Sequence, residues 1–293
     1  MADYTATALV ADMLRRGYVP SGSSTFTTPV LLGLMSDELR GYVVELLRES
    51  GGEHLVVPHT LSVTPGRTEY RLPPRAVANG VRKVAVVLDG LEVQLPQLHP
   101  SALDRGLQGY YLRGAHLVLW PAPLSAQTLR VDYLLRPSQL VSTGHVTVTA
   151  VAEVGTDTVL TLSAASPASV VDVVRASAPF DVLAVSAAGV PSGPGFTLTL
   201  PTASLIGTPE VGDYVCLPDE SPVAQVPLEL HALLAQRTAY AVLAAIGEAG
   251  AQATLQRCED MREQCLRLLT PRDIGAREFV RSSFARRLGR VRR

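Results

Sequence analysis

Histidines and cysteines are the side chains of this sequence best suited to bind a metal or to act as nucleophiles. Only two of the six histidines, His54 and His59, lie close together, five residues apart at an expected helix-to-strand transition. The cysteines Cys216, Cys258 and Cys265 form no CxxC pair. Cys258 and Cys265 are seven apart and would share one helix face as small core residues. We therefore predict no metal site, and free thiols in a chain made in a reducing cytosol.

Acidic and glycine-rich segments offer no better candidate for catalysis. Asp219 and Glu220 are adjacent in a turn ahead of a helix, whose N-terminus favours carboxylates, and they lack a histidine or nucleophile partner. The SGPGF segment 192–196 lies between expected strands, so we interpret it as a turn and not as a phosphate-binding loop. Trp120 follows an alternating strand and is expected at the edge of the core. With no HExxH, GxSxG, Walker or GxGxxG motif, we expect neither an enzyme nor a cofactor.

The composition favours a globular protein that associates with other chains. The 293 residues are 47% hydrophobic but only 5% aromatic and 18% charged, so the core must consist of Leu, Val and Ala. Contacts between chains would cover leftover apolar surface. The sequence shows no signal peptide and no window of about 20 apolar residues, so no membrane span is expected.

Helical periodicity is confined to the two ends of the sequence. A short amphipathic helix is predicted up to Arg16, followed by a Ser/Gly linker. A stronger helix is predicted to begin with Thr28 as N-cap and Pro29 as first helical residue, and to end at Gly51. Two more helices follow Pro227, separated by a break at Gly247 and Gly250 and ended by Pro271.

The middle of the sequence alternates with a period of two and is rich in turn residues, which is typical of antiparallel strands. Two strands are predicted around the turn at 65–66, and hairpins across 89–90 and around Gly114. Another strand is predicted before Pro137. Residues 144–217 continue as strands and form a second β layer or an insertion.

These elements predict an α+β protein with a discontinuous helical domain and an inserted antiparallel β domain. The boundaries we predict are 1–26 for a short helix and linker, 27–53 and 224–270 for the helical domain, 54–223 for the β domain, and 271–293 for an extended basic C-terminal arm. Within the β domain, 54–137 and 144–217 would be the two layers.

The C-terminal arm differs in charge from the rest of the protein. It holds eight arginines and two acidic residues, a net charge of +6, whereas the remainder holds 18 basic and 25 acidic residues, a net charge of −7. Val280, Phe284, Leu288 and Val291 recur at helical spacing, so the arm can form a helix with one apolar stripe. About 20 such residues are marginally stable alone and would order by docking. A nucleic acid, an anionic membrane and an acidic protein groove are the partners it fits, and a solvated end is the alternative.

The order of segments resembles the head-to-tail adaptor proteins of tailed bacteriophages. The resemblance covers about residues 27–270, and its strongest segments are TPVLLGLMSDELRGYVVELLRESGGEHLV, VTPGRTEYRLPPRAVANGVRKVAVV, GYYLRGAHLVLWPAP, LRVDYLLRPSQLV and VGDYVCLPDESPVAQVPLELHALLAQRTAYAVLAAIGEAG. Residues 142–218 and the first 20 residues match it least.

The resemblance implies a structural virion protein of the neck, made in the host cytoplasm, that forms a ring below the portal, typically of twelve copies. The helical domain would build the ring, the β domain would face outward or toward a tail nozzle or tail-tube protein, and genomic DNA would pass through the channel. The C-terminal arm would grip the portal through Arg277, Phe279, Arg281, Phe284, Arg286, Arg287, Leu288 and Arg290.

Two other functions stay open from the residues alone. A nucleic-acid-binding protein would use the basic C-terminal arm, and its affinity would fall steeply with salt. A carbohydrate hydrolase would need two carboxylates about 5 to 10 Å apart in a cleft, and the sequence offers no such pair.

Overall fold

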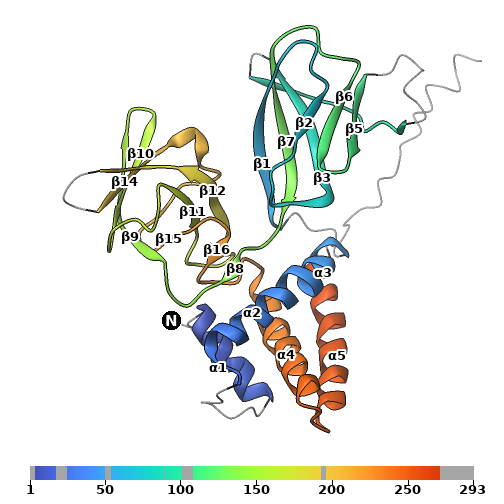
Figure 1. Cartoon of the computed structure of the whole chain (residues 1–293), viewed down its shortest axis with the longest axis vertical. Coiled ribbons are helices and arrows are strands. Elements are labelled where there is room, and N and C mark those ends of the chain that lie inside the picture. The colour runs from blue at the N-terminus through green and yellow to red at the C-terminus, as the bar shows by residue number, and fades with distance from the viewer. Residues whose placement is uncertain are drawn as a thin grey trace, which may run out of the picture.

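The computed structural model places helices at both ends of the chain and strands between them (Figure 1). It describes residues 4–17, 25–49, 54–88, 90–100, 108–192 and 196–270. All eight residues predicted to bind the portal therefore lie outside the described residues. The α+β class, with N-terminal and C-terminal helices flanking antiparallel sheets, is confirmed.

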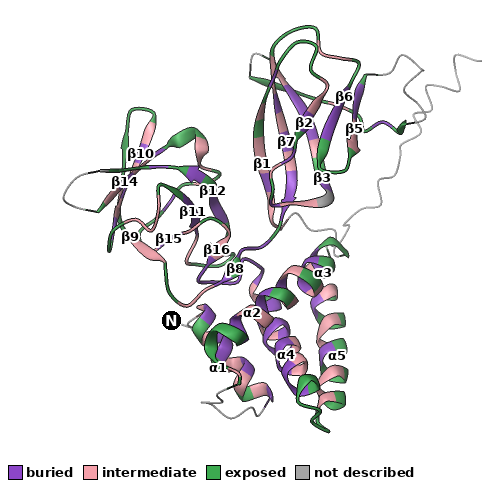
Figure 2. Ribbon diagram, viewed as in Figure 1, coloured by how far each residue is buried: buried purple, intermediate pink, exposed green. Residues whose placement is uncertain are grey.

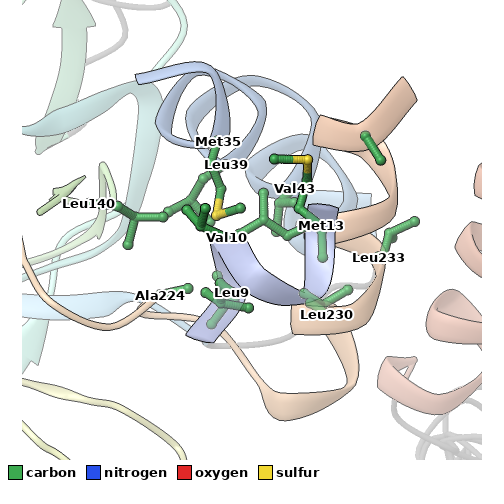
Figure 3. Packing of buried hydrophobic residues seen from close by; sticks show 14 of the residues in the cluster. Leu9, Val10, Met13, Met35, Leu39, Val43, Leu140, Ala224, Leu230 and Leu233 are labelled. Atoms are coloured by element: carbon green, nitrogen blue, oxygen red, sulfur yellow. The ribbon is translucent and has the colours of Figure 1, made fainter. Parts of the chain in front are cut away.

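The helices form one module with a single hydrophobic core, although they come from opposite ends of the chain. Leu9, Val10 and Met13 point toward Met35, Leu39 and Val43 and toward Leu230 and Leu233 (Figure 3). The helix α4 is buried on several sides, because α1, α2 and α5 all pack against it (Figure 2). The helical segments are α1 Ala6–Gly17, α2 Thr28–Glu38, the π-helical turn η1 Leu39–Val43, α3 Val44–Glu49, α4 Leu228–Ala245 and α5 Ala251–Leu269.

The second helical segment starts close to where the sequence predicts, but it is not a regular α-helix throughout. Thr27 is the N-cap instead of Thr28, and a proline occupies the first turn. The π-helical turn η1 adds a residue to one turn, so Leu39 and Val43 both remain buried while Arg40 is directed toward the β strands. Arg237 of α4 holds this segment by an ion pair to Glu38 (Nε–Oε2 2.9 Å) and by stacking over the ring of Tyr42.

The first β unit consists of two sheets packed face to face around one core. A four-stranded sheet has the order β1-β7-β3-β4, and a three-stranded sheet has the order β2-β6-β5. The strands predicted on either side of residues 65–66 therefore belong to different sheets. The bounds are β1 Val56–Val63, β2 Glu69–Arg71, β3 Ala76–Leu88, β4 Leu91–Gln94, β5 Gly109–Arg113, β6 His116–Trp120 and β7 Gln127–Leu135.

Both predicted hairpins of this unit are confirmed. The register of β3 and β4 closes with Leu88 opposite Leu91, and Gly90 has a φ of 81°. The strands β5 and β6 turn at Gly114, whose φ is 59°. Glycine reaches a positive φ without the strain that a Cβ would cause, so these two positions fix where the hairpins turn.

The second β unit is a seven-stranded sheet of order β12-β11-β15-β9-β10-β14-β13 with its own core. Six of these strands coincide with the short alternating segments that the sequence predicts, and β13 is an additional strand. The predicted turn at 192–196 lies mostly outside the described residues. The bounds are β9 Val146–Val154, β10 Asp157–Leu162, β11 Val170–Val174, β12 Val182–Ala188, β13 Val190–Ser192, β14 Thr197–Pro201 and β15 Tyr214–Cys216, with a 3-10 turn η3 at Thr202–Ser204.

A two-stranded stem lies where the chain enters and leaves the second β unit. The strand β8 Gln139–Leu140 pairs in parallel with β16 Glu220–Ser221. Leu140 packs into the helical core, and its backbone N–H donates to Ser36 Oγ of α2 (2.9 Å). The stem therefore attaches the second β unit to the helices. Among the described residues, none of the helices is long and apolar enough to cross a membrane.

The docking of α1 can be tested at Met13, which is completely buried between α1 and its neighbours. We expect Met13→Ala to lower the free energy of unfolding by about 2–5 kcal/mol, because it removes buried apolar volume from a packed core. Urea unfolding followed by the helical circular-dichroism signal measures this loss. The exposed Leu124→Ala is the control, with a change within about 0.5 kcal/mol. Equal stability of both variants would show that α1 does not hold the helical core together.

Candidate interaction surfaces

The helix α5 is the last described element before the predicted C-terminal arm. It runs antiparallel to α4 and ends at Leu269 beside α3 (Figure 1). A partly exposed ion pair joins Arg262 of α5 to Glu49 of α3 (Nη2–Oε2 2.6 Å). The predicted arm, 271–293, lies outside the described residues.

An ion-pair cluster, which we call the junction, connects the three parts of the structure, with Arg75 and Asp172 buried and the other two members partly exposed. It consists of Arg40, Arg75, Asp172 and Asp219. Arg75 precedes β3 in the first β unit, Asp172 lies on β11 in the second, and Arg40 lies in the helical module. The contact between Arg75 and Asp172 joins residues 97 positions apart in the sequence, and the contact between Arg40 and Asp219 joins residues 179 positions apart.

Arg75 is the centre of the junction. Its Nη1 donates to Asp172 Oδ2, and its Nη2 donates to the carbonyl of Arg136 (3.0 Å) and to Ser138 Oγ (2.8 Å). Its Nε lies 3.2 Å from Asp219 Oδ1, an ion-pair contact without hydrogen-bond geometry. The planar guanidinium of arginine suits such a multiply bonded buried position better than a lysine ammonium would.

Asp172 is the buried counter-charge of Arg75, with 0% of its surface exposed. Burial raises the pKa of Asp172, and the neighbouring Arg75 charge opposes this shift. Two backbone N–H groups also favour the charged carboxylate: those of Ser186 (2.7 Å, to Oδ1) and Asp219 (3.1 Å, to Oδ2). Arg75 and Asp219 lie 97 and 47 positions from Asp172 in the sequence, so Asp172 joins segments that are distant in the chain.

Asp219 extends the junction to the helices. Its Oδ2 accepts from Arg40 Nη2 (2.8 Å), while Arg40 Nε donates to the carbonyl of Pro137 (3.1 Å). The structure therefore corrects the role expected for the acidic pair Asp219 and Glu220. Asp219 neutralises two arginines instead of stabilising the helix N-terminus, and it has a φ of 67°, in the left-handed region.

An apolar patch lies at the free end of the β3–β4 hairpin. Leu88, Leu91 and Val93 share one face of the hairpin, which follows from the pairing of Leu88 with Leu91 and of Val86 with Val93. Leu91 is 73% exposed, and Leu124, in the loop after β6, is 96% exposed. A groove of about 250 Å³ between Val86, Leu95 and Trp120 lies beside it. Exposed apolar side chains in one place are typical of protein interaction sites.

His59 and the three cysteines are packed against other parts of the protein, as is usual for residues with a structural role. His59 lies edge-on to the ring of Tyr133, and burial lowers the pKa of His59. All three cysteines are buried and unpaired, and burial raises the pKa of Cys258 to about 11. In the described part of the chain, no three His, Cys, Asp or Glu side chains are placed to hold a metal ion.

Comparison with known protein families identifies the class of protein. The family model described as SU10 adaptor protein matches residues 4–163, which is more than half of the chain. The chain therefore belongs to the SU10 adaptor protein family, a family of bacteriophage structural adaptors and not a class of enzymes. No curated protein matches the sequence. The matched segment includes α1, which the sequence resemblance covered least, and ends within the second β unit after β10.

Sequence reasoning missed the junction, because its members are ordinary charged residues far apart in the chain. Asp219 has a left-handed backbone conformation and Ser138 follows a proline, but neither feature produces a recognisable sequence motif. A weak signal existed in Arg75, the charged residue between the turn at Pro73-Pro74 and a long strand. No pattern in the sequence pairs it with Asp172.

The junction predicts a strong, non-additive effect of mutation. We expect Asp172→Asn to destabilise the protein by about 3–5 kcal/mol, because it leaves the Arg75 guanidinium buried without its counter-charge. The double variant Arg75→Met, Asp172→Leu should cost less than the sum of the single variants Arg75→Met and Asp172→Leu. Denaturant unfolding of the four proteins measures this coupling. Strict additivity would show that the pair does not act as a unit.

The hairpin patch predicts altered association without altered stability. We expect the double variant Leu91→Asp, Val93→Asp to keep the wild-type free energy of unfolding to within about 1 kcal/mol, because both side chains are already solvated. Sedimentation velocity at increasing concentration should show less self-association or less binding of a neck protein. Arg48→Asp on α3 is the control for added negative charge. Unchanged association of the patch variant would assign the patch no role in assembly.

Proposed function

We propose that this chain is the head-to-tail adaptor of its virion and forms an oligomeric ring between the portal and the tail. The family membership is the observation that carries the proposal. The exposed patch on the β3–β4 hairpin supports it, because an adaptor must contact more than one neighbour. The virion neck is the location that this role implies.

In this proposal the parts of the chain have separate tasks. Residues 27–53 and 224–270, together with α1 from the first segment 1–26, form the ring wall, and the β units within 54–223 face outward or toward a tail nozzle or tail-tube protein. Twelve copies would close the ring, and genomic DNA would pass through its channel. The net charge of −7 outside the C-terminal arm is compatible with a channel through which DNA slides without sticking.

The C-terminal arm, 271–293, would dock on the portal. Its net charge of +6 suits an acidic socket, in which arginines make bidentate contacts to carboxylates. Arg277, Arg281, Arg286, Arg287 and Arg290 would supply these contacts, and Phe279, Phe284 and Leu288 would be the apolar anchors. A nucleic acid is the alternative partner of the same arginines.

The arm is tested by comparing one truncated chain and two full-length variants with the wild type. We expect a chain ending at residue 271 to lose binding to the portal protein of the same virus, and Arg→Glu at 281, 286, 287 and 290 to have the same effect. Arg→Lys at the same four positions keeps the charge and should retain part of the affinity. Biolayer interferometry on the purified portal ring measures the affinities, and sedimentation measures the ring separately.

Duplex DNA in the same assay separates the two partners. Binding to DNA that is lost with the arm, with a linear fall of log affinity against log salt, would favour the nucleic-acid function. Portal binding that survives removal of the arm would refute the docking proposal and leave ring formation to be judged from sedimentation.

A further inference from the structure

A cleft of about 700 Å³ lies between the two β units. We call it the β1–β12 cleft, because β1 with Tyr133 forms one wall and the end of β12 with residues 203–206 forms the other. Its volume is within the range of about 300–1,000 Å³ that is usual for ligand sites. Both strands are edges of their sheets, since β1 ends the four-stranded sheet and β12 ends the seven-stranded one.

The unpaired edge of β1 opens into this cleft. The N–H of Leu135 donates to the carbonyl of Leu55, so odd-numbered residues of β1 pair with β7 and even-numbered residues point their backbone groups away from it. Thr60 therefore turns its N–H and C=O outward. Pro58, which lacks an N–H, also occupies an outward position, so no hydrogen bond to β7 is lost there. Pro58, His59 and Thr60 line the cleft.

The opposite wall combines small and larger side chains. Ala187, Ala188, Ala203 and Ser204 are the small ones, and Val185, Leu205 and Ile206 are the larger ones. The N–H of Gly189 donates to the carbonyl of Ser169 on the β11 side, so the backbone groups of Ala188 point away from β11. A single extended segment in the cleft would thus face the unpaired edge of β1 on one side and the backbone groups of Ala188 on the other. The carbonyl of Leu183 and the N–H of Ser186 are already bonded, to the N–H of Ile206 and to Asp172 Oδ1.

The charge of the cleft selects the chemistry of its occupant. His59, Arg71 and Arg75 are the ionisable side chains other than tyrosine that line it, and no acidic side chain is among its lining residues. Arg75 is neutralised within the junction, and His59 is neutral near pH 7 because burial lowers its pKa. Within the described residues Arg71 has no ion-pair partner, so it leaves one uncompensated positive charge beside the cleft. This charge disfavours the chain's own basic C-terminal arm as the occupant.

We propose that the β1–β12 cleft binds an extended acidic segment of a partner protein, which adds as a strand to the free edge of β1. Backbone hydrogen bonds to Thr60 supply affinity, and a carboxylate opposite Arg71 supplies selectivity. A strand of about five residues spans about 17 Å, which covers the outward positions from Pro58 to Ser62. The partner would be a third neighbour, in addition to other copies of the chain and the portal.

The probe is a displayed library of random seven-residue peptides selected against the full-length protein, with the enriched peptides then synthesised for fluorescence anisotropy. We expect enriched sequences that alternate in polarity and contain an acidic residue. Thr60→Pro removes one outward N–H without touching the pairing with β7, and Arg71→Glu reverses the charge. Each should weaken binding at least about tenfold. Arg48→Glu on α3 makes the same charge change far from the cleft and should leave binding unchanged.

Ala188→Trp fills the cleft from the opposite wall and guards against a folding defect of Thr60→Pro. Circular dichroism and thermal unfolding identify the variants that fold, and loss of peptide binding in folded Ala188→Trp supports the proposal independently. The proposal fails if no peptide is enriched, or if the enriched peptides bind Thr60→Pro and Ala188→Trp as tightly as the wild type. It also fails if Thr60→Pro abolishes self-association, because a second copy would then be the occupant of this edge.

Discussion

The burial of one guanidinium constrains the arrangement of the whole structure. Arg75 and Asp172 are both shielded from water, which is costly for a charged pair unless hydrogen bonds replace the lost water contacts. Both Nη atoms of Arg75 and both carboxylate oxygens of Asp172 have such bonds, while Arg75 Nε makes only an ion-pair contact. The partners of Arg75 come from both β units, and Asp219 joins them to Arg40 of the helices. Apolar clusters also cross between the modules: Val57 and Tyr133 of the first β unit pack with Val182 of the second, and Phe180 packs with Val223 ahead of α4. Because apolar contacts are less directional than hydrogen bonds, the bonds of the junction narrow the orientations that these contacts allow.

The course of the chain explains why such a constraint is needed. The helical core is completed only when α4 and α5 return after about 180 residues of strands, so α1 and α2 cannot bury their apolar faces before that. The second β unit enters and leaves through the paired strands β8 and β16, which lie against the helices. The segment matched by the family model ends inside this unit. The matched segment therefore depends on unmatched helices for its core, and it is not a folding unit by itself.

Local patterns predicted most of the elements, but they did not predict the π-helical turn η1, the short strands β8, β13 and β16, or the long-range charge pairing. Period-two alternation and the glycines at 90 and 114 located the strands and hairpins, because these signals act between neighbours in the chain. Arg40 and Asp219 are 179 residues apart, and nothing local marks them as partners. The sequence placed β1 and β2 as partners around a common turn, whereas each pairs with a strand later in the chain, β1 with β7 and β2 with β6. The arm residues named from the sequence lie beyond the described chain, so their role stays a prediction.

The two proposed binding sites, the C-terminal arm and the β1–β12 cleft, would bind their partners through interactions that differ in range and in sensitivity to salt. The C-terminal arm carries six net positive charges, whose attraction acts over about one Debye length, roughly 8 Å at physiological salt, and weakens as salt rises. Strand addition at β1 depends on backbone hydrogen bonds, which act only in contact and are far less sensitive to salt. Under these proposals the positive charge of Arg71 beside the cleft disfavours the basic arm there, so the two sites would take different occupants. An adaptor built in this way can hold one neighbour by charge and another by backbone pairing, and a change of salt would release the first while the second stays bound.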